Sequence, residues 1–263
     1  MPTHPFLAGP YPRAYAHRGW HVGELASMEN SLSALRRAVI EGYRYLETDV
    51  HATRDGVPVV LHDPALDRTT DSCGVVAELG WHQVRRARIG GCEPVCRLAD
   101  LLEELPTALL NIDVKAESAV RPVLELLRCT GAWNRVCLAS FSERRLHRLR
   151  RAAGPRLLTS MGIASVVALR VRSLLPLLPL HLLLPLGAHL AQVPLRRGPV
   201  PVVDPALLRH ARRHGIEVHV WTVDDPGVMG VLLDAGVDGL VTDRPDRLRE
   251  VLALRGSWPD TGQ

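Results

Sequence analysis

The chain has 263 residues, of which 46% are hydrophobic and only 4% aromatic, so leucine, valine and alanine must fill the core of one large or two small domains. The net charge of +4 and the pI near 9.0 favour an anionic partner without selecting one. The arginines are spread along the chain with no basic tail, which argues against a nucleic-acid-binding protein. Five cysteines, an odd number, and the lack of a signal-peptide pattern predict a reduced, cytoplasmic chain.

Apolar runs alternate with amphipathic stretches along almost the whole chain. In chain order the predicted strands are 14–16, 45–50, an extended piece at 57–63, 109–115, 135–141, 156–161, a further strand near 188–194, 217–223 and 239–243. The predicted helices between and after them are 29–42, 98–105, 117–131, 142–154, 205–215, 226–236 and 244–256.

Repeated strand-then-helix units imply parallel strands joined by crossover helices. The number of strands fits a closed TIM (β/α)₈ barrel, an α/β fold, better than an open doubly wound sheet. No GxGxxG motif opens the first helix, which also argues against a dinucleotide-binding fold.

Two stretches interrupt this alternation. Residues 64–97 are long, turn-rich and weakly periodic, and excursions of this kind usually lie over the functional face of a barrel. Residues 173–195 contain no Asp, Glu, Lys or Arg, but their prolines argue against a regular membrane-spanning helix. A buried or barrel-covering segment is the favoured interpretation of 173–195, and an apolar patch that contacts lipid is the alternative.

Polar side chains gather at the ends of the predicted strands. Side chains two apart on a strand share a face, so Glu47 points with Asp49, and Asp113 points with Lys115. Because catalytic groups of a barrel collect at the carboxyl ends of its strands, both pairs are expected at one mouth.

Other strand ends add further polar groups to this mouth. His17 and Arg18 lie just past the first strand, and His62 and Asp63 end the extended piece that follows the second. His219 and Trp221 share a face late in a strand of the C-terminal half, so they are expected to join the same group.

Three carboxylates in one cavity, those of Glu47, Asp49 and Asp113, repel one another, so without a cation one or more should be protonated. A hard divalent ion removes this conflict, and both Mg²⁺ and Ca²⁺ take such oxygen ligands. Zinc fits less well because carboxylates dominate, although the nearby histidines leave it open. The alternative, that these acids cap helices or pair with arginines, explains two such pairs at strand ends less well.

Lys115 is the only lysine in the chain, against thirty-one arginines. A compact ammonium fits beside a metal in a narrow barrel where a planar guanidinium does not, so Lys115 is predicted to reach a phosphoryl oxygen or a ligating carboxylate. The guanidinium of Arg18 suits a phosphate. His17 and His62 carry imidazoles, which can act as base and acid on the two sides of a phosphorus atom.

The ordered motifs of the chain resemble those of the glycerophosphodiester phosphodiesterase family. AHRG, then EN, then ETDVHATRDGVPVVLHD, then LDRTT match the opening block of the family in order and spacing. NIDVK, ASFS, VHVWTVDD and GVDGLVTDRPD match its later blocks, so the resemblance covers about residues 14 to 250.

The resemblance implies one TIM-barrel domain over residues 1–263, with a small insertion after the second strand at 64–97. It implies hydrolysis of a glycerophosphodiester to sn-glycerol 3-phosphate and an alcohol, with one bound Mg²⁺ or Ca²⁺. The roles that it implies are metal ligation by Glu47, Asp49 and Asp113, acid–base catalysis by His17 and His62, phosphate binding by Arg18 and Lys115, and packing on glycerol by Trp221.

The sequence departs from the family pattern at two places. The family usually has glutamate where this chain has Asp113, which is shorter by one methylene, so the identity and affinity of the metal stay open. It often has proline before EN, where this chain has Met28. Glu29 and Asn30 either orient the residues after the first strand or start the helix, and the helix start is the favoured interpretation.

Two other functions stay open. The leucine-rich stretch 173–195 suggests a lysophospholipase D that uses the same site on a lysophospholipid and contacts lipid at the membrane periphery. A non-catalytic barrel that binds phosphodiesters or lipid surfaces would be favoured by a missing catalytic residue, and none is missing. The head group and the oligomeric state are not determined by the sequence.

Overall fold

The computed structural model describes residues 4–175 and 186–258, and in this part of the chain a parallel sheet forms a nearly closed TIM-like barrel. The order of strands along the sheet is β8-β7-β6-β2-β1-β13-β12-β9. A hydrogen bond from Met161 N to Leu190 O, 2.8 Å long, links the chain after β8 to β9. The strands are β1 (Arg13–His17), β2 (Tyr45–Ala52), β6 (Leu109–Val114), β7 (Val136–Ala139), β8 (Leu158–Thr159), β9 (Leu190–Pro194), β12 (Glu217–Trp221) and β13 (Gly239–Thr242).

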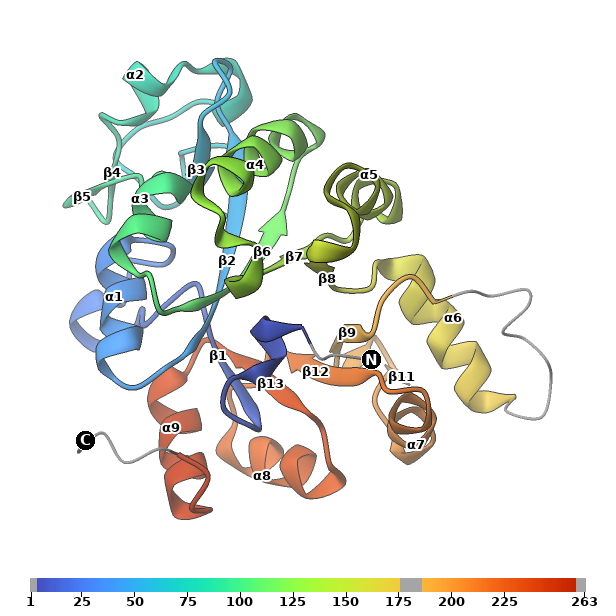
Figure 1. Ribbon diagram of the computed structural model, residues 1–263. Coiled ribbons are helices and arrows are strands. Elements are labelled where there is room, and N and C mark those ends of the chain that lie inside the picture. The colour runs from blue at the N-terminus through green and yellow to red at the C-terminus, as the bar shows by residue number, and fades with distance from the viewer. Residues whose placement is uncertain (1–3, 176–185, 259–263) are drawn as a thin grey trace.

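Helices follow the strands and form an outer layer around the barrel (Figure 1). Several begin at a side chain that accepts a hydrogen bond from the first turn, as Ser142, Asp204 and Asp225 do. The α-helices of the described residues are α1 (Leu32–Ile40), α2 (Trp81–Val84), α3 (Leu98–Glu104), α4 (Glu117–Thr130), α5 (Glu143–Ala153), α6 (Ile163–Leu174), α7 (Pro205–Arg213), α8 (Pro226–Ala235) and α9 (Pro245–Leu254).

These elements confirm the predicted α/β barrel, and the clearest difference is α6, which the sequence pattern does not reveal. The α6 sequence is rich in β-branched residues such as Val166 and Val171, which weakens helix propensity. Ile163 and Val167 are exposed although they are apolar, so the helix lacks a clean polar face. Because of both features, the apolar residues of α6 do not show a clear helical spacing in the sequence.

The segment between β3 (Pro58–Val60), which pairs antiparallel with β2, and α3 forms a small unit of its own on the barrel. It contains α2 and the antiparallel strands β4 (Arg88–Ile89) and β5 (Glu93–Pro94). Its own apolar core joins the barrel through Met28 and Ala34, and its buried members include Val59, Leu61, Leu66, Val76, Val84, Ala87, Ile89 and Val95.

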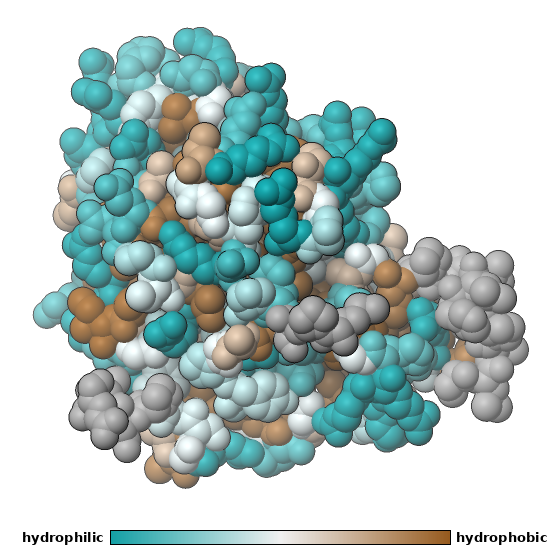
Figure 2. Space-filling view, viewed as in Figure 1, coloured by the Kyte–Doolittle hydropathy of each residue, from teal (hydrophilic) through white to brown (hydrophobic). Residues whose placement is uncertain are grey.

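The amino-terminal end of the barrel is closed by packed side chains. Phe6, from the 3₁₀ turn Pro5–Ala8, is buried against Tyr15, Tyr45 and other inward-facing residues. In Figure 1 this blue segment crosses the opening that faces the viewer, and Figure 2 shows side chains packed over the same side. Open space for chemistry must therefore lie at the opposite end, where the strands have their carboxyl ends.

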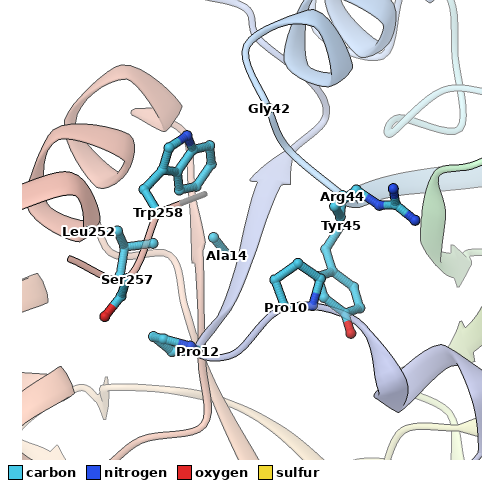
Figure 3. A pocket seen from close by; sticks show the side chains of 9 residues that line it. All are labelled: Pro10, Pro12, Ala14, Gly42, Arg44, Tyr45, Leu252, Ser257 and Trp258. Carbon is cyan, nitrogen blue, oxygen red and sulfur yellow. The ribbon is translucent and has the colours of Figure 1, made fainter. Parts of the chain in front are cut away.

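A small cavity lies beside this closed end, between the start of β1 and the C-terminal residues (Figure 3). Its lining includes Pro12, Tyr45, Leu252 and Trp258. Its volume is about 20 Å³, which is room for roughly one water molecule, so it cannot hold a substrate.

Of the apolar stretch 173–195, the structure describes the end of α6 and the whole of β9. Residues 176–185, which include Pro176, Pro179 and Pro185, lie outside the described part of the chain, so the prediction of a barrel-covering segment stays untested there. Among the described residues there is no helix of the length and apolarity that a membrane crossing requires.

Candidate active site

A cavity of about 710 Å³ opens at the carboxyl ends of the strands. This volume lies within the range of small-molecule sites. Eight of the side chains that the sequence places at the mouth line this cavity: His17, Arg18, Glu47, Asp49, His62, Asp113, Lys115 and Trp221. The barrel thus brings together residues from position 17 to position 221.

The neighbouring strands β2 and β6 set the acidic residues beside one another. Their register pairs Glu47 with Asn111 and Asp49 with Asp113. The ammonium of Lys115 lies between two carboxylates, with Nζ 2.7 Å from Asp49 Oδ1 and 2.8 Å from Asp113 Oδ2. Lys115 therefore contacts two of the three carboxylates that the sequence proposes as metal ligands.

Three buried oxygens at this site have no hydrogen-bond partner among the residues that the structure describes: Oε2 of Glu47, Oδ1 of Asp113 and Oδ1 of Asn111. Buried acceptors are normally satisfied, so oxygens of this kind that line a cavity are positioned to contact a ligand. A hard divalent cation suits such donors. In the described chain, however, no group of three or more His, Cys, Asp or Glu side chains converges on a metal position, and the Lys115 ammonium fills the space between two of the acids.

The electrostatics of the three carboxylates differ. Burial and the charge of Asp49 raise the pKa of Glu47 to about 8. Burial also raises the pKa of Asp113, although Lys115 partly offsets it. The pKa of Asp49 is lowered, because Lys115 and Arg18 outweigh the effect of its burial. Burial is thus the largest cause of the raised pKa of Glu47 and of Asp113, and repulsion from the charge of Asp49 adds to both shifts.

His17 is oriented by a carboxylate that follows β13. Its Nδ1 atom lies 2.5 Å from Asp243 Oδ1, which leaves Nε2 near Glu47 Oε2 at 3.6 Å. Burial alone lowers the pKa of His17, but Glu47 and Asp243 raise it overall. Asp243 is itself fixed by a hydrogen bond of 2.8 Å from its backbone N–H to Asp224 Oδ1.

His62 has a carboxylate in the corresponding position. Its Nδ1 atom lies 2.6 Å from Asp63 Oδ1, and Arg68 donates from Nε to Asp63 Oδ2 at 2.7 Å. The hydrogen bond from Arg68 holds the pKa of Asp63 well below its usual range, so this carboxylate stays ionised. Arg68 also pairs with Glu29 at 2.6 Å, and Glu29 accepts from Arg18 Nη1 at 3.0 Å. A continuous set of contacts thus joins His62 to Arg18.

The favoured interpretation of Glu29 and Asn30 as the start of the helix is wrong. Ser31 is the N-cap of α1. Asn30 instead donates from Nδ2 to Asp49 Oδ2 at 2.9 Å, and Glu29 pairs with Arg18. The EN motif therefore positions site residues, because its side chains turn inward toward the barrel.

Trp221 lines the cavity, with its ring centroid 5.7 Å from that of Phe141 and the two planes at 87°. The expectation that His219 joins the mouth is wrong. His219 is fully buried, its register partner on β13 is Gly239, and its Nε2 lies 3.1 Å from Glu217 Oε2. Inward-facing residues of one strand lie at successive depths, so His219 is one layer below Trp221.

Apolar side chains cover the part of the cavity away from the acids. They come from the loop after β7, from the chain after β8, from α6 and from the chain after β9, and they are Phe141, Met161, Ile163, Val166, Val167 and Val202. The site therefore combines a charged end with an apolar wall.

Sequence reasoning places Asp63 at the mouth without giving it a role, and it misses Asp243 and Arg68, which also hold site residues in place. Asp63 and Asp243 were both visible as acids in matched motifs, at VLHD and VTDRPD, and each follows a strand. That signal could have identified them as partners of the histidines. Arg68 also lies in a matched motif, LDRTT, but it does not end a strand, and only the fold of the segment after β3 brings it to Asp63 and Glu29.

Comparisons with known proteins identify the family of the chain. The glycerophosphoryl diester phosphodiesterase family matches residues 16–247. The probable glycerophosphodiester phosphodiesterase 2 of Mycobacterium tuberculosis is 42% identical, over 98% of this chain and 97% of its own. Human lysophospholipase D is 26% identical, over 90% of this chain and 85% of its own.

Among solved structures, the fold is similar to that of an Oleispira antarctica phosphodiesterase in complex with its product sn-glycerol-3-phosphate. The TM-score is 0.74 at 20% identity, over 92% of this chain and 97% of the other. The family match covers most of the chain, and the relative from M. tuberculosis spans nearly all of it. The chain therefore belongs to the glycerophosphoryl diester phosphodiesterase family, whose members are phosphoric diester hydrolases.

Proposed function

We propose that this phosphodiesterase hydrolyses glycerophosphodiesters to sn-glycerol 3-phosphate and an alcohol, with one bound Mg²⁺ or Ca²⁺. One observation carries the proposal: unpaired buried oxygens of Glu47 and Asp113 line a cavity between two histidines that are each oriented by a carboxylate. The product bound to the O. antarctica phosphodiesterase supports the choice of sn-glycerol 3-phosphate. The free state of all five cysteines is in keeping with the cytoplasmic location that we also propose.

In this proposal Glu47, Asp49 and Asp113 hold the ion. When bound, it neutralises the negative charge that grows on the phosphoryl oxygens during the reaction. The guanidinium of Arg18 binds a phosphoryl oxygen, and Lys115 adds a second positive charge from inside the barrel. Asn30 keeps Asp49 in place through its hydrogen bond to Oδ2.

The two histidines move the protons. With Nδ1 of each histidine engaged by Asp243 or Asp63, Nε2 is the atom left to exchange a proton with substrate. One imidazole takes the proton of the nucleophile, and the other gives a proton to the leaving oxygen. The nucleophile is either water or the 2-hydroxyl of glycerol, and the second route passes through a cyclic phosphate. Trp221 packs against the glycerol part.

Ion removal tests the function directly. Hydrolysis of a glycerophosphodiester, followed by release of sn-glycerol 3-phosphate, is expected to stop in EDTA and to return with Mg²⁺ or Ca²⁺. Asp113→Asn, which keeps the size of the side chain but removes its charge, is expected to require more ion for half-maximal rate. Full activity in EDTA would show that the proposed ion has no role. Phosphorus NMR during turnover separates the two nucleophiles, because only the route through the 2-hydroxyl of glycerol forms a cyclic phosphate.

A second candidate is hydrolysis of lysophospholipids at the same site. The apolar wall contributed by α6 favours it, because an acyl chain could lie along Ile163, Val166 and Val167. The human relative named lysophospholipase D supports the idea. The rates of hydrolysis of glycerophosphocholine and lysophosphatidylcholine distinguish the two candidates. A strong preference for glycerophosphocholine, which has no acyl chain, excludes lysophospholipid hydrolysis.

A further inference from the structure

A short hairpin forms part of the cavity wall directly after β9. Its strands are β10 (Arg196–Arg197) and β11 (Val200–Pro201), and it turns at Gly198, whose φ of 58° suits a residue without a side chain. Pro194, the last residue of β9, is the register partner of Trp221 on β12. The hairpin therefore rises beside Trp221, at the edge of the mouth.

The hairpin lies across the mouth from the acidic residues. In the strand order of the barrel β9 is four places from β2, and this separation is half-way round a ring of eight strands. The acids that line the cavity are Glu47, Asp49 and Asp113, which all come from β2 and β6. The mouth thus has a carboxylate side and, opposite it, the side of the hairpin.

The side of the hairpin is positive. Arg196 and Arg197 line the cavity and are exposed, and Arg170 of α6 lines it beside them. Arg170 is neutralised by Asp204 at 2.7 Å, and Arg196 donates from Nη2 to the carbonyl of Pro199 at 2.5 Å. Among the described residues Arg197 pairs with no carboxylate, so this rim carries positive charge without a matching acid.

The aromatic residues of the cavity do not offset this charge. A cationic head group such as choline is usually bound by faces of aromatic rings. The ring of Phe141, however, already has the Lys115 ammonium over it, with Nζ 5.8 Å from the centroid, and its neighbour is Trp221. A quaternary ammonium placed there would lie between Lys115 and the arginines of the hairpin.

We propose that Arg196 and Arg197 bind a second anionic group of the substrate, so that the preferred diesters are those whose alcohol carries a phosphate or a carboxylate. This proposal rests on the proposed function, because it assigns the substrate class of the same site. The charge on the hairpin then acts in two ways: it attracts an anionic alcohol and repels a cationic one.

Three diesters with the same sn-glycerol 3-phosphate half test the proposal: one with glycerol phosphate as its alcohol, one with glycerol and one with choline. We expect the kcat/KM of the intact protein to fall in that order, and the spread to shrink when salt is added. In the double variant Arg196→Glu/Arg197→Glu, kcat/KM for the phosphate-bearing diester should fall by about tenfold, since two exposed ion pairs with the second anionic group are lost. In the same variant, kcat/KM for the glycerol diester should change by no more than about twofold, because screened surface charges have only a weak effect on it.

Arg144→Glu/Arg151→Glu is the matched control, because both arginines are exposed on α5, neither lines the cavity, and the change in net charge is the same. It should leave the ranking of the three diesters unchanged. Equal rates for the three diesters, or an unchanged ranking in the hairpin variant, would overturn the proposal. A hairpin variant that loses only its binding to phosphatidylglycerol vesicles would overturn it too, because that result assigns the arginines to a lipid surface.

Hydrolysis of the glycerol diester tests the proposed function separately from the role given to the hairpin arginines. If the protein hydrolyses it in the presence of ion, the proposed function holds whichever way the head-group ranking falls. If none of the three diesters is hydrolysed with Mg²⁺ or Ca²⁺, the proposed function fails, and the assignment of the hairpin fails with it.

Discussion

The two histidines at the mouth share one arrangement, a carboxylate at Nδ1 and a free Nε2. His17→Ala and His62→Ala are each expected to lower kcat by about 10²- to 10⁴-fold, because acid–base catalysis contributes that much. Circular dichroism and thermal unfolding should show both variants folded. Near-normal turnover in either variant would remove that histidine from the mechanism. His21→Ala is a suitable control, since His21 contacts Asp243 at 3.2 Å but does not line the cavity.

The single lysine has a steric explanation at the residue scale. Lys115 Nζ lies within 2.8 Å of oxygens from both Asp49 and Asp113, and this pair of contacts suits a compact ammonium better than a planar guanidinium. Lys115→Arg is therefore expected to lower kcat/KM by at least about tenfold although the charge is kept, a loss of ~1.4 kcal/mol. Steady-state kinetics at saturating ion measure it. If arginine supports normal activity, the lysine is explained by chance and not by the space available to it.

At the scale of elements, the connection from β1 to α1 carries much of the site. Arg18 and Asn30 have positive φ values of 55° and 62°, which non-glycine residues adopt mainly where the surroundings enforce it. Gly19 passes so close to α1 that a Cβ atom there would lie 2.7 Å from the backbone of Ala34. This tight approach points the side chain of Asn30 at Asp49.

Two adjacent residues in this connection should have separable effects. Asn30→Ala removes a partner of Asp49 and is expected to weaken ion affinity or activity by about 10- to 100-fold, as for other residues that orient metal ligands. Ser31→Ala removes the N-cap of α1 and is expected to cost about 1 kcal/mol of stability with little change in ion affinity. Ion titration and urea unfolding of both variants measure the two effects. Equal ion affinity in the two variants would contradict the role given to Asn30.

At the scale of the whole molecule, the closed end of the barrel depends on a buried ion pair far from the mouth. Arg13 is 5% exposed and pairs with Glu217 at 2.8 Å. Although burial opposes it, the hydrogen bonds from His219 and Arg13 lower the pKa of Glu217 to about 2 from its ordinary 4.5. A depressed pKa means that the pair stabilises the fold fully above about pH 4.5 and loses this contribution as the pH falls toward 2.

Glu217→Gln is therefore expected to lower the free energy of unfolding by about 2 kcal/mol at pH 7, the worth of a hydrogen-bonded charge. The difference from the original protein should shrink as the pH falls through this window, because the carboxyl becomes protonated in both the folded and the unfolded state. Urea unfolding at pH 7 and near pH 3 measures it. A difference that does not change with pH would show that packing, and not charge, accounts for the loss.

The sequence by itself determined the α/β barrel, because the hydrophobic periods of strands and helices are local and can be read from the order of apolar and polar residues. It also determined which polar residues end strands, and strand ends in a barrel meet at one mouth. Tertiary structure decided which of these residues touch. His219 and Trp221 share a face but differ in depth, and Asn30 reaches Asp49 only because the chain turns sharply against α1. Packing between distant segments sets the depth of a side chain in the barrel, the conformation of a turn and long-range contacts such as that of Arg68 with Asp63. No local sequence pattern encodes this packing.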